Sequence, residues 1–352
     1  RRRSMGVTSS VSRCPTFVRN MSWGTGEENE AALCSQESMK RTGKESETKF
    51  IVSLELDAKH CTKMADVTLG KVIGHGSSAT VFRCRIRGKA AACKQSVVAP
   101  LRGKVGINSI DLLKNECSIW SHISHKNVVG FLGAAFDGPC FCLLCEYMQD
   151  GSLFNKHERR RTSRASPLTE HVLLDQLQQV ASGMRYLHAH EPPIIHRDLK
   201  SANVLLDGKR LAIADFGLAR YQAIDMTAET GTYRWMAPEI IRHGRYCARC
   251  DVYSYAMLTT EMLTDQTPFN ELCSREAALK AANGYRPTLP EGTPGWVKDL
   301  LVSSWAQDVQ TRPTFQDICD FLAETALEVS GQGGGTSYAR YTRHRSVILS
   351  KP

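Results

Sequence analysis

The strongest constraint on the fold is a change of hydrophobic pattern near residue 150. Before it, four segments alternate or run apolar with glycine-rich turns between them, as strands do: VTLGKVI, TVFRCRIR, AAACKQS and FCLLCEY. One helical spacing interrupts them, carried by Ile110, Leu113, Cys117, Trp120 and Ile123. After Gly151 the pattern is helical, as in LLDQLQQVASGMRYLHAH. This order predicts an α+β fold of two lobes: a small strand-rich lobe with one helix, then a larger, mostly helical lobe.

The ends of the chain differ from this middle region in composition. Residues 1–65 are rich in Ser, Thr, Glu and Lys, and they contain few large apolar side chains. Such a segment buries too little surface to offset the entropy of ordering, so we expect 1–65 to be disordered. Residues 66–329 form the expected globular domain, with lobes at 66–148 and 149–329. The glycine-rich and then basic residues 330–352 predict a flexible tail.

The charge of the chain is positive and clustered. The formal net charge is +9, with arginines gathered at residues 1–3, 159–161 and 340–345. We interpret these runs as solvated tails and loops, the second of them lying in a loop at 157–166 that precedes the next helix. A nucleic-acid-binding protein is the alternative that the charge suggests, but no recognition module supports specific nucleic-acid binding.

The cysteines bear on the compartment. The chain has 13 of them, opens with Arg-Arg-Arg-Ser-Met rather than an apolar run, and contains no 18-residue apolar stretch. We therefore expect a cytoplasmic protein with reduced thiols and no transmembrane segment. Two CxxC pairs, Cys142–Cys145 and Cys247–Cys250, could bind zinc, but their separation and the apolar run around the first pair favour buried thiols.

Two features of the strand-rich region predict phosphate binding. Gly74 and Gly76 form a turn between two strands, where backbone N–H groups can approach phosphates without interference from Cβ atoms. An ordinary hairpin would explain this turn equally well. Lys94 ends an apolar strand, so its ammonium group would be buried and would need a partner of opposite charge. Glu116, on the helix that follows, is the expected partner, and the pair would hold Lys94 against the α- and β-phosphates of a nucleotide.

The segment His196–Asn203, HRDLKSAN, carries a carboxylate, an ammonium and a carboxamide in one short loop. Phosphoryl transfer needs an acceptor for the hydroxyl proton, a cation near the γ-phosphate and a metal ligand, which Asp198, Lys200 and Asn203 would supply in turn. Asp215 follows after the apolar run LAIA, in the tripeptide Asp-Phe-Gly. Its carboxylate is a hard oxygen ligand suited to Mg²⁺, with Mn²⁺ as an alternative.

In this order and spacing, these motifs resemble those of the eukaryotic protein kinase family from about Val67 to Val329. The resemblance implies a bilobal kinase fold, ATP as the phosphate donor and protein substrates. It also implies that Glu239, in Ala-Pro-Glu, pairs with Arg312, and that Asp251 opens a central helix and steadies the catalytic loop.

The type of kinase follows from the same resemblance. Lys200 is the residue that serine/threonine kinases use in the catalytic loop, whereas GTYRWMAPE and DVYSYAM resemble tyrosine kinases. This mixture is typical of the tyrosine-kinase-like group, the relatives of Raf, mixed-lineage and plant receptor-like kinases. We therefore expect a serine/threonine kinase of signal transduction. A dual-specificity kinase and a pseudokinase are the alternatives, although pseudokinases usually lack counterparts of Lys94, Asp198 or Asp215.

The resemblance also predicts the nucleotide pocket and the regulatory segment. Cys145 would stand at the gatekeeper position, Glu146 to Met148 at the hinge, and Asp150 near the ribose. Thr232 would bond to Asp198, while phosphorylation of Thr227 or Thr230, read by Arg197 and Arg220, would order the activation segment. The apolar walls around the adenine would come from Ile73, Val81, Ala92 and Leu205.

Overall fold

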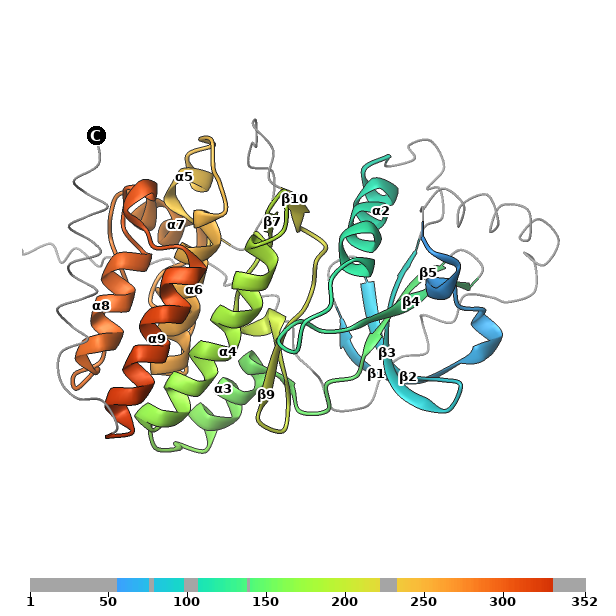
Figure 1. Ribbon diagram of the computed structural model, residues 1–352, viewed down its shortest axis with the longest axis horizontal. Helices are drawn as coiled ribbons and strands as arrows, with labels where there is room; N and C mark the ends of the chain where they lie inside the picture. Colours follow the sequence, from blue (N-terminus) through green and yellow to red (C-terminus); the bar gives the residue numbers. More distant parts are fainter. Residues whose placement is uncertain (1–55, 76–78, 98–106, 138–139, 222–232, 332–352) are drawn as a thin grey trace, which may run out of the picture.

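The protein is described here from a computed structural model, which defines residues 56–75, 79–97, 107–137, 140–221 and 233–331. Figure 1 shows two lobes: a twisted sheet with one helix beside it, coloured blue to teal, and a bundle of helices coloured green to red. The predicted α+β fold with a strand-rich first lobe and a helical second lobe is confirmed.

The first lobe is built on a five-stranded antiparallel sheet with the strand order β1-β2-β3-β5-β4. The central strands β3 and β5 are buried over Ala91–Cys93 and Phe141–Cys145, which explains their continuous apolar sequences. The elements are β1 (Val67–His75), β2 (Ala79–Ile86), β3 (Lys89–Val97), α2 (Ile107–Ser121), β4 (Phe131–Asp137) and β5 (Cys140–Glu146).

The second lobe is helical apart from short strands near its junction with the first. The strands are β6 (Gly151–Ser152), β7 (Ile194–Ile195), β8 (Val204–Asp207), β9 (Arg210–Ile213) and β10 (Arg220–Tyr221). The helices are α3 (Leu153–Thr162), α4 (Glu170–His188), α5 (Pro238–Ile241), α6 (Arg249–Thr264), α7 (Ser274–Ala282), α8 (Gly295–Ser304) and α9 (Phe315–Val329). Two 3₁₀ turns complete it, η3 (Ser201–Asn203) and η4 (Val309–Thr311). In the ranges that the structure defines, every helix is too short or too polar to cross a membrane.

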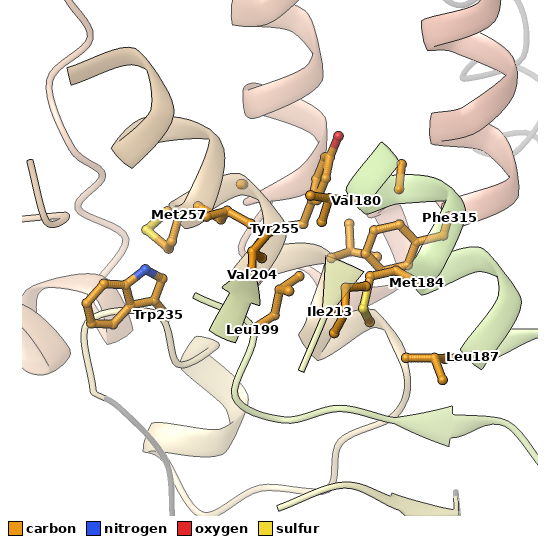
Figure 2. Packing of buried hydrophobic residues seen from close by; sticks show 14 of the residues in the cluster. Val180, Met184, Leu187, Leu199, Val204, Ile213, Trp235, Tyr255, Met257 and Phe315 are labelled. Atoms are coloured by element: carbon orange, nitrogen blue, oxygen red, sulfur yellow. The ribbon is translucent and has the colours of Figure 1, made fainter. Parts of the chain in front are cut away.

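The core of the second lobe lies where α4, α6 and α9 meet the β8–β9 hairpin. Figure 2 shows side chains from these elements converging, among them Met184 of α4, Ile213 of β9 and Phe315 of α9. Helix α6 is buried along almost its whole length, so it serves as the central support of the lobe. The same cluster continues into the first lobe through Ile119 and Trp120 of α2.

The cysteine predictions can be checked in the defined part of the chain. Its eleven cysteines are free thiols, and Cys142 and Cys145 are buried in β5 as expected. Burial raises the pKa of the Cys145 thiol to about 12, which keeps it protonated. Of the second pair, Cys250 is buried and Cys247 is half-buried.

The prediction of a solvated loop at 157–166 is wrong for its first half, which belongs to α3. The helix starts earlier because Ser152 and Asn155 form a capping box at its N-terminus. His157 is buried rather than solvated, and its Nδ1 lies 2.7 Å from Asp265 Oδ1. Arg160 also binds Asp265, at 3.1 Å, so one arginine of the basic run joins α3 to the end of α6.

The expectation of disorder up to residue 65 is also wrong for its last ten residues. Residues 58–60 and 64–66 form two 3₁₀ turns, η1 and η2, and Thr62 N donates to Ala134 O of β4 at 2.9 Å. These turns are too short to show a hydrophobic period, which is why the sequence pattern missed them. Leu56 and Met64 nevertheless pack, partly buried, against the hydrophobic clusters of the sheet.

Candidate active site

Lys94 lies at the centre of the charged residues that join the two lobes. Its Nζ donates to Glu116 Oε1 of α2 and to Asp215 Oδ1, both at 2.8 Å. The predicted pair of Lys94 and Glu116 is therefore present, and Asp215 comes from the other lobe to meet it. The antiparallel pairing of β3 with β2 and β5 fixes Lys94, because Val81 and Leu143 lie opposite it in the register.

The three charges shift one another's pKa values. Burial opposes the charged form of Lys94, but Asp215 and Glu116 outweigh it and raise the pKa of the ammonium. Lys94 in turn lowers the pKa of Asp215 to about 2, against the opposing effect of burial. Glu116 is the most buried of the three, and burial raises its pKa although Lys94 opposes the shift. Lys94 and Asp215 are therefore charged at neutral pH.

A column of aromatic rings runs beside these charges and crosses between the lobes. His196 of the catalytic loop meets Phe216 edge-on at 5.4 Å between ring centroids. Phe216 lies 5.6 Å from Trp120 of α2, and Trp120 lies 5.7 Å from Phe131 of β4. Because Trp120 follows Glu116 by one helical turn, this column sets the orientation of α2 that brings Glu116 to Lys94.

The catalytic loop gathers its polar side chains around Asp198. Lys200 Nζ donates to Asp198 Oδ2 at 2.7 Å, and Asn203 Nδ2 donates to the same oxygen at 3.0 Å and to Asp198 O at 2.8 Å. The three residues that the sequence predicted to act together are therefore within hydrogen-bonding reach of one another. This arrangement holds an acceptor carboxylate beside an ammonium group.

Asn203 and Asp215 lie close together because Ala214 N donates to Asn203 O at 2.8 Å. The amide nitrogen of Asn203 is turned to Asp198, and Lys94 binds Oδ1 of Asp215. Within the defined residues, no hydrogen bond reaches the two remaining oxygens, Asn203 Oδ1 and Asp215 Oδ2. Two neighbouring hard oxygens without protein donors are a donor set that fits a divalent cation such as Mg²⁺.

Asp251, at the start of α6, binds the backbone of the catalytic loop, as predicted. Its Oδ2 accepts from His196 N and its Oδ1 from Arg197 N, both at 2.8 Å. His188 Nε2 lies 2.9 Å from the same carboxylate. Burial opposes the charge, but these partners outweigh it and lower the pKa of Asp251. The carboxylate thereby fixes a loop in which Arg197 has the positive φ of 69°.

Sequence reasoning missed Glu261, a second buried carboxylate of α6. It accepts from Ser201 Oγ at 2.7 Å, from Ser201 N at 3.1 Å and from Trp235 Nε1 at 2.7 Å. Burial raises its pKa. Through these bonds Glu261 connects the catalytic loop to the Trp235 segment. The signal that could have revealed it is a single acidic residue inside the apolar run YAMLTTEML.

The end of the activation segment is anchored by the predicted pair of Glu239 and Arg312. Arg312 Nη1 and Nη2 donate to the two carboxylate oxygens of Glu239, each at 2.8 Å. The guanidinium is fully buried, which such bidentate pairing permits. The predicted residues Thr227, Thr230 and Thr232 lie outside the residues that the structure defines. Arg197 and Arg220 are defined, and the ring of Tyr246 lies 5.6 Å from the Arg197 guanidinium carbon.

The apolar residues predicted to surround the adenine come together from both lobes. Ala92, Cys145 and Met148 are buried members of the main cluster, and Ile73, Val81 and Leu205 pack against it half-buried. Cys145 faces Ala92 across the β3–β5 pair. Gly74 pairs with Val81 in the β1–β2 hairpin, whereas Gly76 lies outside the defined residues.

Glu146 of the hinge and Asp150, the residue predicted near the ribose, have side-chain partners that the sequence did not predict. Both oxygens of Glu146 accept from Arg210 of β9, the second at 2.8 Å, so the hinge is tied to the second lobe. Asp150 Oδ2 accepts from Gly208 N at 2.7 Å, at the turn between β8 and β9. The contact of Asp150 with a ribose stays a prediction.

The comparisons with known proteins cover the region of this site. The sequence model of the family described as protein tyrosine and serine/threonine kinase matches residues 67–322. The serine/threonine-protein kinase STY17 of Arabidopsis thaliana is 38% identical over 273 residues, which are 76% of this chain and 46% of the relative. The serine/threonine-protein kinase TNNI3K of Rattus norvegicus is 34% identical over 302 residues, 83% of this chain and 35% of the relative.

This chain thus spans less than half the length of either relative. The family match nevertheless includes Lys94, Glu116, the catalytic loop and Asp215. The chain belongs to the protein tyrosine and serine/threonine kinase family, in the tyrosine-kinase-like group that its motifs resemble.

Proposed function

We propose that this chain transfers the γ-phosphate of ATP to serine and threonine hydroxyls of protein substrates. The observation that carries the proposal is the position of Lys94 Nζ, 2.8 Å from both Glu116 and Asp215, across the junction of the two lobes. The choice of acceptor is supported by the relatives, which are named serine/threonine-protein kinases. Residues 66–329 would form the catalytic domain, with lobes at 66–148 and 149–329.

In the proposed reaction the acceptor oxygen forms a bond to the γ-phosphorus while the bond from that phosphorus to the β-phosphate oxygen breaks. Asp198 accepts the proton of the hydroxyl, and Lys200 balances charge on the transferring group. Lys94 binds the α- and β-phosphates. Asn203 Oδ1 and Asp215 Oδ2 would hold a divalent cation, for which Mg²⁺ is our choice over Mn²⁺. When bound, the cation neutralises the charge of the phosphates.

The test is transfer of radiolabelled γ-phosphate to a serine, threonine and tyrosine peptide library by the full chain and by its Asp198→Asn variant. We expect the substitution to lower the rate at least about 100-fold, because it removes the proton acceptor, while nucleotide binding persists. Phosphoamino-acid analysis would distinguish serine/threonine from dual specificity. Nucleotide binding without transfer by the unmodified chain would instead favour the pseudokinase alternative.

We also propose regulation by phosphorylation of Thr227 or Thr230, with Thr232 bonding to Asp198. Support comes from Arg220 of β10, which pairs with Ile195 of β7, two residues before Arg197. The Thr227→Ala/Thr230→Ala double variant is expected to lose activation by preincubation with MgATP. Full activity in that variant would contradict the regulatory role. The free thiols support our further proposal of a reducing, cytoplasmic location.

A further inference from the structure

The segment that precedes the family match lies against β4, the strand that carries one end of the aromatic column beside Glu116. Residues 56–62 run beside β4, where Cys61 forms a parallel bridge to Ala134 and Thr62 N donates to Ala134 O at 2.9 Å. Figure 1 shows this start of the defined chain, in blue, beside β4 and β5. The family match begins only at residue 67, so it assigns no role to this segment.

His60 adds a fifth ring to the aromatic column. Its ring meets Phe131 edge-on, with centroids 5.3 Å apart and planes at 74°. His60 N is held by Asp57 O at 2.8 Å, which fixes the turn that presents the ring. Burial lowers the pKa of His60, so the ring is neutral at pH 7 and suited to packing on phenylalanine.

The buried nitrogen of His60 shows that packing, and not a hydrogen bond, holds the ring in place. His60 Nδ1 is buried and has no hydrogen-bond partner among the defined residues. An unpaired polar atom is a cost that a phenyl ring would not bear. A phenylalanine at this position should therefore preserve whatever the imidazole contributes to the column.

Leu56 is a second residue of the segment that packs against the first lobe. It packs half-buried against the cluster formed by Cys117 of α2, Ala134 of β4, and Phe141 and Leu143 of β5. Gly133 shows how closely the segment approaches, because a Cβ there would lie 2.6 Å from His60 O. The segment therefore lies on β4 and on a cluster to which α2 contributes Cys117, the residue next to Glu116.

We propose that residues 56–62 position Glu116 for phosphoryl transfer, with His60 extending the column Phe131–Trp120–Phe216–His196 and Leu56 packing on the cluster that joins Cys117 of α2 to β4 and β5. His60 and Leu56 are positioning residues, because they act on Glu116 and Lys94 through α2. The inference rests on the proposed kinase function for its catalytic consequence. It predicts that sequences upstream of residue 56 can change activity by pulling this segment off the sheet.

The test uses the full chain and amide hydrogen exchange of α2, with α9 as an internal reference. Loss of an aromatic contact is worth about 3–10-fold in an opening equilibrium, so His60→Ala should lower protection of α2 by about that factor and leave α9 unchanged. His60→Phe should match the unmodified chain or exceed its protection. Lys59→Ala is the matched control, since Lys59 is exposed in the same turn and its ion pair among the defined residues is with Asp57.

The catalytic readout is kcat/KM for ATP in the Leu56→Ala/His60→Ala double variant, expected to fall at least about threefold. The inference is overturned if α2 protection in His60→Ala stays within about twofold of the unmodified chain, if α9 loses protection equally, or if His60→Phe behaves like His60→Ala. It is also overturned if the double variant lowers α2 protection without changing kcat/KM. Absence of transfer by the unmodified chain would refute the kinase proposal alone, since the exchange measurements still decide whether the segment holds α2.

Discussion

At the scale of single residues, the site contains more negative than positive charge around Lys94. One ammonium faces two carboxylates, Glu116 and Asp215, each at 2.8 Å. The surplus negative charge favours a cation at the neighbouring oxygens of Asp215 and Asn203. A divalent cation at these oxygens would offset that surplus and would leave a net positive charge toward which phosphates are attracted.

Cys145 leads to a prediction about inhibitor selectivity. Its side chain is small and lies across the β3–β5 pair from Ala92. A methionine there would clash with groups that extend past it into the core, at a cost of about 1–3 kcal/mol or roughly tenfold in affinity. We expect Cys145→Met to weaken ATP-competitive inhibitors that carry such an extension by at least about tenfold and to leave KM for ATP within about threefold. Inhibition constants for matched compounds with and without the extension measure this, and equal losses for both would contradict it.

Glu261 leads to a prediction about stability. Three donors, two from Ser201 and one from Trp235, point at its carboxylate. In Glu261→Gln the amide oxygen can keep the bonds from Ser201 N and Trp235 Nε1, and the N–H₂ can donate to the Ser201 hydroxyl, but the hydrogen bonds to an ionised carboxylate become bonds to a neutral amide, so we expect a loss of about 1 kcal/mol in the free energy of unfolding. Urea denaturation is the measurement.

The control for Glu261 is Asp320→Asn. Asp320 is exposed on α9 and accepts from Gln316 Nε2 at 2.9 Å, a bond that asparagine can keep. We expect this variant to stay within about 0.5 kcal/mol of the unmodified chain. A Glu261→Gln variant as stable as Asp320→Asn would show that the buried carboxylate is dispensable.

At the scale of elements, the approach of α4 to the β9 strand depends on one glycine. A Cβ on Gly183 would lie 2.7 Å from Asn127 O and 2.8 Å from Ile213 Cδ1. The side chain of Ile213 can move, but the carbonyl of Asn127 also accepts from Ile213 N at 2.9 Å and is fixed by that bond. Helix α4 can therefore pack this closely only with glycine at this position.

We expect Gly183→Ala to destabilise the protein by about 1–3 kcal/mol through overpacking, which outweighs the gain of about 1 kcal/mol in helix propensity. Ser182→Ala, at the neighbouring half-buried position of α4, is the matched control and should change stability by less than about 1 kcal/mol. Thermal or urea unfolding of both variants makes the comparison. A stabilised Gly183→Ala would mean that propensity outweighs the contact.

At the scale of the whole molecule, the pair of Glu146 and Arg210 links the hinge to the second lobe. Arg210 lowers the pKa of Glu146 through bidentate hydrogen bonds, against the effect of burial. Because the folded-state pKa lies below the ordinary value of 4.5, the pair's stabilisation is fully present above pH 4.5. It is lost as the pH falls through the lowered folded-state pKa.

The corresponding prediction is that Arg210→Met lowers the free energy of unfolding by about 1 kcal/mol at pH 7, since the pair is partly exposed to solvent. The difference from the unmodified chain should shrink as the pH falls below 4.5. Urea denaturation at a series of pH values tests this. A difference that stays constant, or grows toward acid pH, would contradict the assignment to Glu146.

The sequence alone was enough to predict the residues whose partners lie within a motif or follow from one. Asp198, Lys200 and Asn203 share one loop, so their contacts are local. The pair of Lys94 and Glu116 could be predicted because a charge at the end of a buried strand needs an opposite charge. Glu239 and Arg312, 73 residues apart, were paired only through the family resemblance, and the structure confirms the contact.

Helix α3 shows why local pattern can fail. Only Leu153 and His157 of this helix are buried, and its other residues include three consecutive arginines. Its buried surface is too small to produce a helical period, so charge alone suggested a loop. The helix is stabilised by the capping box of Ser152 and Asn155. It is also stabilised by the contacts of His157 and Arg160 with Asp265, more than 100 residues away.

The sequence by itself determined the division into a sheet-rich and a helical lobe, and it predicted which residues would bind or transfer phosphate. Tertiary structure alone decided that Glu146 meets Arg210, 64 residues away, that Glu261 meets Ser201, 60 residues away, and that His60 extends the aromatic column. Each of these contacts joins two segments whose own hydrophobic patterns do not require the contact, so the patterns cannot reveal it. Only the packing of α2, α6 and the β9 strand against their neighbours brings such partners within bonding distance.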